Sequence, residues 1–143
     1  MPTLPVNADV QFLPGTGKLW VDRLIDPSGN PLTVLDIDAG FTVEGRLVLP
    51  GWLSGKGVVR LAADEIGGQI DKEIGHMDVP ITGSTVPTDP PSKTYPWSIT
   101  VRSPALPDES KMYQFGVVFI FQTLGGGHTD IGGFYDLGAF LVV

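Results

Sequence analysis

Short apolar runs alternate with polar residues along much of this chain, and turn-forming residues separate one run from the next. The clearest alternation is Phe41–Leu49, in which Phe, Val, Gly, Leu and Leu fall on one face and mainly polar residues on the other. Tyr95–Ser103 follows the same pattern, with Trp97, Ile99 and Val101 on one side. Because successive side chains of a strand point to opposite faces, both segments are predicted to be half-buried strands of an antiparallel sheet.

Other segments add strands to this pattern. In chain order, we predict further strands over Val10–Leu13, Lys18–Ile25, Leu32–Ile37, Gly57–Asp64 and His76–Thr82. Pro80 lies inside the last of them and predicts an edge strand, because proline cannot donate to a hydrogen-bonded ladder. Glu65–Lys72 is predicted as a turn with a short edge strand, and a single helical turn is the alternative.

The last third of the chain contains its two most apolar segments, Tyr113–Gln122 and Gly133–Val143, on either side of a glycine-rich stretch. We predict that they are the two central strands. The total is then about seven to nine strands, at intervals typical of a sandwich or barrel. The predicted fold is all-β, an antiparallel two-sheet sandwich of Greek-key type, with a jelly roll as the alternative.

Both central strands are apolar on their two faces, whereas an antiparallel sheet of a monomer usually leaves one face polar. Val118 and Ile120 lie on the face opposite the one that we expect to fill the core. At the end of the chain, the side chains that must also be covered are either Leu137, Ala139, Leu141 and Val143, or else Phe140 and Val142. Either the N-terminal arm or a neighbouring subunit has to cover these side chains. We therefore predict interface positions at Val118, Ile120, Leu141 and Val143.

The length of the chain and its charged residues indicate one domain and argue against several kinds of partner. The chain has 143 residues, the size of one domain, which we place at residues 18–143 after an N-terminal arm over residues 1–17. Its net charge is −7 and its nine basic residues are scattered, which argues against nucleic acid and anionic membrane surfaces as partners. No run reaches the roughly 18 apolar residues of a membrane helix, so we predict no membrane insertion. Cysteine is absent and no signal peptide is evident, and we expect a cytoplasmic protein.

The segment Leu106–Phe115 (LPDESKMYQF), which leads into the first central strand, resembles the E–F corner of immunoglobulin-like domains. In those domains a tyrosine near the start of strand F bonds back to the preceding loop. Tyr113 takes that place here, with Phe115 as the inward residue two positions later. The paired cysteines and the strand-C tryptophan of the pattern are missing. The resemblance covers the architecture of residues 18–143 and implies adhesion, assembly or binding more often than catalysis.

Two similar pentads, GHMDV and GHTDI, carry the two histidines of the chain. In an extended strand, residues two apart point to the same side, so His76 with Asp78, and His128 with Asp130, could each offer an imidazole and a carboxylate to one metal ion. Solvent-exposed turn residues are the simpler interpretation, and we predict no metal or other cofactor.

Two aromatic residues suggest a binding surface of another kind. Trp52 lies in a glycine-rich loop and Tyr95 stands beside the long proline-rich loop Gly83–Thr94. Exposed Trp and Tyr side chains can stack on a sugar ring or fill a pocket of a partner. The alternative is that Trp52 folds back over the end of the sandwich. Trp20 and Trp97 fall on strands, and we predict both in the core.

Sequence motifs for catalysis are missing. No serine occupies a glycine-bounded elbow between a strand and a helix, and Gly125–Gly127 lacks the Lys-Ser/Thr of a phosphate loop. The acidic pairs, such as Asp36 with Asp38, are typical of turns. Our leading hypothesis is a non-enzymatic assembly or protein-interaction domain that forms a homo-oligomer through its C-terminal sheet. The alternative is a carbohydrate-binding or small-ligand module that uses Trp52 and Tyr95.

Overall fold

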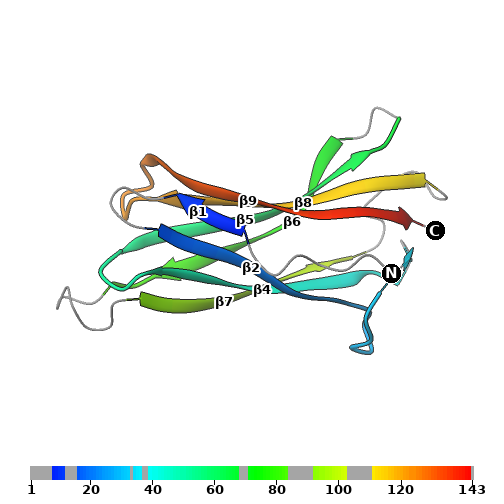
Figure 1. The fold of residues 1–143 in the computed structure, drawn as a ribbon, viewed down its shortest axis with the longest axis horizontal. Coiled ribbons are helices and arrows are strands. Elements are labelled where there is room, and N and C mark those ends of the chain that lie inside the picture. Colours follow the sequence, from blue (N-terminus) through cyan, green and yellow to red (C-terminus); the bar gives the residue numbers. More distant parts are fainter. Residues whose placement is uncertain are drawn as a thin grey trace.

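The computed structural model describes residues 8–11, 16–32, 34–36, 39–67, 71–83, 92–102 and 111–142, and these contain strands and no helix (Figure 1). The strands are β1 (Ala8–Gln11), β2 (Thr16–Ile25), β3 (Val34–Leu35), β4 (Phe41–Pro50), β5 (Gly55–Glu65), β6 (Asp71–Ile81), β7 (Ser92–Val101), β8 (Lys111–Gln122) and β9 (His128–Val142). The predicted strands are thus present, and several of them are longer than the sequence pattern indicates. β3 is shorter than the predicted Leu32–Ile37, because Leu32 and Asp36 lie outside it. β1 falls within the segment predicted as an arm.

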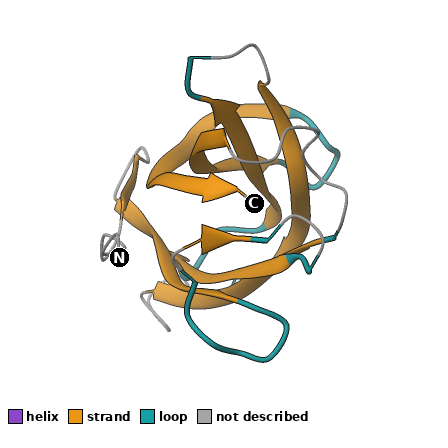
Figure 2. Cartoon of the chain, turned by 90° about the vertical axis from the view of Figure 1, so that its right-hand side faces the viewer, coloured by secondary structure: helices purple, strands orange, loops and turns teal. Residues whose placement is uncertain are grey.

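The strands form two layers packed face to face (Figures 1 and 2). The described strands pair along one path in the order β6-β5-β8-β9-β1-β2-β4-β7, with β3 paired to β9 off this path. The strands β6-β5-β8-β9 and the strands β2-β4-β7 lie in opposite layers. Between the two sheets, β1 pairs with β9 at Gln11 and Gly132. The fold is therefore all-β with two sheets, as predicted. β8 lies between β5 and β9, and β9 pairs with β8, β1 and β3, so both are inner strands of the described path, whose midpoint lies between β9 and β1.

One pairing departs from the prediction of a wholly antiparallel fold. β3 runs parallel to β9, with Val34 opposite Leu141 and Leu35 opposite Val142. The other described ladders are antiparallel. β3 lies between β2 and β4 in the sequence, so the chain leaves the sheet of β2 and β4, pairs with β9 in the other sheet, and returns.

Inward side chains from both sheets fill the space between the layers. The alternating residues of β4 and β7 that were predicted to face inward are buried, and so are those of β8 from Tyr113 to Phe121. Phe115 packs edge-on against Phe41 at 6.1 Å and against Phe140 at 5.8 Å between ring centroids. Burying side chains of this size contributes about 1.5–3 kcal/mol each, so this cluster is a major part of the core.

The two outermost strands, β6 and β7, meet along one side of the sandwich through side chains. The backbone N–H of Ser98 donates to the sulfur of Met77 at 3.3 Å. The hydroxyl of Tyr95 and the ammonium of Lys93 both donate to the carbonyl of Thr82, at 3.1 and 2.6 Å. In the described ladders β6 pairs with β5 alone, so it is the edge strand that Pro80 predicts.

A β-bulge in β9 sets which residues of the last strand face outward. Phe115 pairs with Gly138 while the next residue of β8 pairs with Asp136, so Leu137 is an extra residue of β9. Gly138 adopts φ +94°, which favours glycine at this position. As a result Leu137 and Phe140 both point into the core, and Leu141 is exposed.

The prediction that Trp20 belongs to the core is wrong, whereas Trp97 is buried at 3% exposure. Leu19 and Val21 are the inward residues of this part of β2, so the residue between them points outward. The guanidinium of Arg46 lies 5.1 Å from the Trp20 ring centroid, and the ammonium of Lys18 lies 5.9 Å from it. Trp20 therefore belongs to the charged outer face of β2.

Candidate interaction surface

The outward side chains of β5, β8 and β9 form a face rich in apolar residues, which we call the β8 face. Val118 and Ile120 both point outward from β8 and are half-buried, while the residues on either side of them are buried in the core. Cross-strand pairing places Arg60, Val118 and Phe134 in one row, and Val58, Ile120 and Gly132 in the next. Antiparallel neighbours of this kind lie about 5 Å apart, so the apolar side chains form a continuous surface.

Phe134 is the largest exposed side chain on the β8 face, at 57% exposure. Its ring lies over the backbone of Gly116, because a Cβ atom on that glycine would come within 2.5 Å of the ring. Phe134 was not among the predicted interface residues. Its place beside Val118 follows from the β8–β9 register, and the bulge at Leu137 hides that register from a simple count of residues.

Toward the other end of β8 a second row of apolar residues crosses the sheet. Val34 pairs with Leu141, Leu141 pairs with Met112, and the N–H of Ile66 donates to the carbonyl of Met112 at 2.9 Å. All four side chains are exposed. Leu141 is thus exposed, and its place in an interface stays a prediction. Val143, predicted with it, lies outside the described residues.

Charged and polar side chains border the β8 face. Lys56 lies 3.5 Å from Asp78, and Arg60 lies 3.2 Å from Glu73, on the side of β5 and β6. On the side of β9, the amide of Gln114 donates to Asp136. An apolar centre with a polar border is the usual composition of a protein–protein interface.

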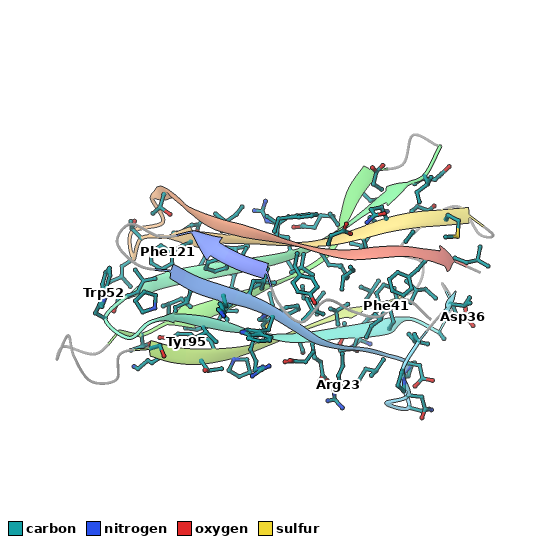
Figure 3. All side chains as sticks on the ribbon, viewed as in Figure 1. Arg23, Asp36, Phe41, Trp52, Tyr95 and Phe121 are labelled. Carbon is teal, nitrogen blue, oxygen red and sulfur yellow. The ribbon has the colours of Figure 1, made fainter. Side chains whose placement is uncertain are left out.

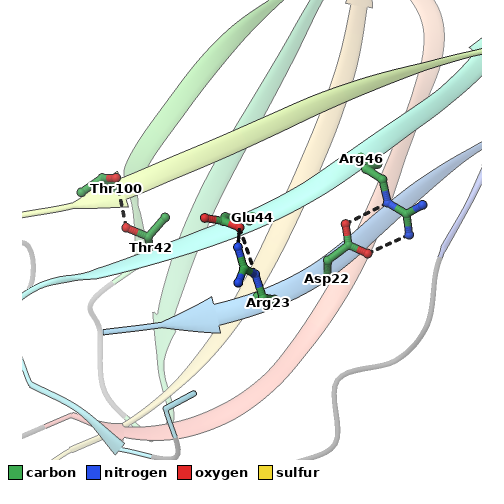
Figure 4. A network of polar contacts seen from close by, with 6 residues as sticks. All are labelled: Asp22, Arg23, Thr42, Glu44, Arg46 and Thr100. Carbon is green, nitrogen blue, oxygen red and sulfur yellow. Dashed lines mark hydrogen bonds and ion pairs between the residues drawn. The ribbon is translucent and has the colours of Figure 1, made fainter. Parts of the chain in front are cut away.

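The outer face of the other sheet is polar (Figure 4). A β-bulge in β2 at Asp22 directs this carboxylate to Arg46, which donates to it through Nε at 2.9 Å and Nη2 at 2.8 Å. The bonded carboxylate raises the pKa of Arg46. Arg23 forms a second ion pair with Glu44 at 2.5 Å. These exposed charges pair with one another. Among the described residues, no large hydrophobic side chain of β2, β4 or β7 is exposed, so this face has little apolar area to offer a partner.

A shallow groove of about 370 Å³ runs across this polar face. Its lining residues are Asp22, Glu44, Gly45, Arg46, Met77, Pro96, Trp97 and Ser98. Both carboxylates in it are already engaged in the ion pairs described above.

The two aromatic residues predicted for ligand binding lie at one end of the sandwich (Figure 3). Trp52 is 46% exposed, in the turn between β4 and β5. Tyr95 is half-buried on β7 and packs against the core. Burial raises the pKa of its hydroxyl, which donates to the carbonyl of Thr82. Of the two, Trp52 is thus the side chain with area to offer a ligand.

The four residues predicted as alternative metal ligands lie on strands that are not neighbours. β5 and β8 lie between β6, which carries His76 and Asp78, and β9, which carries His128 and Asp130. Three strand spacings amount to about 14 Å. The side chains of His128 and Asp130 lie outside the described residues. Within the described part of the chain no cluster of three or more metal-ligating side chains occurs.

No known protein family, curated protein or solved structure matches this chain. A search of the described residues for a helix that is long and apolar enough to span a membrane finds none.

Proposed function

We propose that this chain is a non-enzymatic assembly domain that binds another protein through the β8 face. The observation that carries the proposal is the exposed apolar area on this face, with Phe134 at 57% exposure beside Val118 and Ile120. An antiparallel sheet that faces only water usually carries polar residues on that side. In the same molecule, the outer face of β2, β4 and β7 is polar, unlike the β8 face.

The solution mass tests this proposal directly. We expect the wild-type protein to form an oligomer in size-exclusion chromatography with light scattering, and we expect Ile120→Lys to yield a folded monomer. Ile120 is half-buried and points away from the core, so a lysine there can reach solvent in the monomer. Thr94→Lys is the matched control, because Thr94 is exposed on the outer face of the other sheet. A wild-type protein that stays monomeric at all concentrations contradicts self-association.

We further propose that the sandwich is immunoglobulin-like. Immunoglobulin sandwiches contain strands A-B-E in one sheet and C′-C-F-G in the other. The strand orders β2-β4-β7 and β6-β5-β8-β9 correspond to these, with β2 as strand A, β8 as strand F and β9 as strand G. Tyr113 is fully buried near the start of β8, the place of the corner tyrosine. This agreement in strand order supports the resemblance to immunoglobulin-like domains, which implies assembly or binding more often than catalysis.

A carbohydrate-binding or small-ligand module is the second candidate, and the exposure of Trp52 favours it. Glycans stack on exposed tryptophan faces, so binding should quench the tryptophan fluorescence. Titration with a glycan panel tests this, with Trp52→Ala as the variant that loses the response. Trp97→Phe is the control, since Trp97 is buried at 3% exposure. A response that survives in Trp52→Ala would exclude this site.

A further inference from the structure

Two residues of opposite charge flank β8 within one row of each other, Arg60 on β5 and Asp136 on β9. Arg60, on β5, pairs with Val118 of β8, which pairs with Phe134 of β9. Two residues further along β5, Ala62 pairs with Gly116 of β8, which pairs with Asp136 of β9, and these three residues form the next row on the same face. The face thus carries a cation on the β5 side, a column of apolar residues along β8, and an exposed ring with a carboxylate on the β9 side.

This arrangement is complementary to itself under one particular rotation. A two-fold axis that lies between two such faces and runs along β8 exchanges the two sides of the sheet. It places β5 of one molecule over β9 of the other and stacks β8 on β8. An axis across the strands would instead place β5 over β5 and β9 over β9, so that Arg60 of one copy could not face Phe134 or Asp136 of the other. Two-fold axes are by far the commonest symmetry of homo-oligomers, and both subunits then use the same surface.

We propose, resting on the assembly function above, that the partner is a second copy of this chain. The two copies are related by a two-fold axis along β8. Arg60 of each copy then lies against Phe134 and Asp136 of the partner subunit. The contact occurs twice, once on each side of the apolar column formed by Val118 and Ile120.

The atoms available on these residues suit this contact. Arg60 bonds Glu73 through Nε, and its terminal NH groups extend beyond that atom. Asp136 accepts from Gln114 and from the N–H of Gly138 through Oδ1, which leaves Oδ2 for a guanidinium. A guanidinium also binds the face of an aromatic ring such as Phe134. Two packed sheets cross at an angle of about 30°. Arg60 can therefore reach the partner's residues in its own row, which contains Phe134, or in the next row, which contains Asp136.

Mixing two charge-reversed variants tests the axis. Arg60→Glu places a carboxylate opposite Asp136 at both contacts of a homodimer, and Asp136→Lys places a lysine opposite Arg60 at both. We expect each variant alone to dimerise at least about tenfold more weakly, because like charges across an interface repel. In the mixed dimer one contact is Glu with Lys and the other is the native Arg with Asp. We therefore expect an equimolar mixture to regain the dimer, measured by light scattering and by native mass spectrometry of the heterodimer.

The controls separate this inference from the function on which it rests. Arg23→Glu reverses a paired arginine on the opposite outer face, and it should leave the dimer intact. Circular dichroism melts confirm that each monomer is folded. A wild-type oligomer that Ile120→Lys disrupts, but that survives both charge reversals or is not restored by the mixture, overturns the two-fold axis and leaves the assembly function standing. A wild-type protein without any oligomer overturns self-association through the β8 face and, with it, the two-fold axis.

Discussion

Phe134 and Gly116 fit together so closely that the glycine has no room for a side chain beneath the ring. A Cβ atom on Gly116 would lie 2.5 Å from Cε2 of Phe134. The ring therefore lies against the backbone of Gly116, and its exposed part faces outward as part of the β8 face.

The first prediction uses this pair. Gly116→Ala should tilt the Phe134 ring away from the sheet and weaken the dimer, while unfolding stability changes by less than about 1 kcal/mol because the ring is exposed and can rotate. Phe134→Ala should weaken dimerisation by about tenfold or more, as expected when an exposed aromatic anchor is removed. Sedimentation equilibrium measures both. Unchanged dimer mass at low micromolar concentration in Phe134→Ala would contradict the role of this residue.

The second prediction concerns the core side of β4. A Cβ atom on Gly45 would lie 2.0 Å from the carbonyl oxygen of Trp20 and 2.3 Å from the ring of Trp97. A backbone atom cannot move aside by a rotamer change, so Gly45→Ala should cost about 3 kcal/mol of unfolding free energy or more. Gly125→Ala is the control, with no atom within 4 Å of its added Cβ, and should stay within about 0.5 kcal/mol of wild type. Urea unfolding compares the two, and equal midpoints would refute the packing.

The third prediction concerns Tyr135, which is buried and whose hydroxyl has no hydrogen-bond partner. Burial, with a smaller contribution from the charge of Asp22, raises its pKa to about 12. The folded protein then keeps this proton at a pH where the unfolded chain loses it. The ionisation of Tyr135 therefore leaves the unfolding free energy unchanged below pH ~10 and lowers it as the pH rises toward ~12.

Tyr135→Phe should remove this part of the alkaline loss. It should also raise the unfolding free energy at pH 7 by about 1 kcal/mol, since an unpartnered buried hydroxyl costs about 1–3 kcal/mol. Chemical unfolding of both proteins at pH 7 and pH 11 gives the comparison. A variant that is less stable at pH 7 would show that the hydroxyl has a partner in solution.

The fourth prediction separates the ion pairs of the polar face from the core. Asp22→Asn should lower the melting midpoint slightly, because its pair with Arg46 is exposed on both sides. Arg46→Ala should lower it further, since this side chain also packs on the ring of Trp20. High salt should reduce the fall in melting midpoint caused by Asp22→Asn, because salt screens exposed charges. The part of the fall in Arg46→Ala that comes from lost packing should not depend on salt. Melting curves at low and high salt measure this, and a salt-independent loss in Asp22→Asn would contradict it.

Local alternation determined much of the sandwich in advance. The inward residues of β4 and β7 could be assigned because a strand has a period of two and one buried face. The apolar character of β8 on both faces was equally visible, and it pointed to Val118 and Ile120 as surface residues before any pairing was known. Both point outward in the structure.

Pairing between distant segments decided the rest, because it depends on contacts that no local pattern encodes. The parallel contact of β3 with β9 and the strand order are of this kind. The bulge at Leu137 shifts the register of β9 by one residue, which buries Phe140, exposes Leu141 and sets Phe134 beside Val118. The sequence by itself determined which strands form and which faces are apolar. Only the tertiary structure decided which side chains meet across strands, since a single extra residue in a ladder reverses the face that every later residue presents.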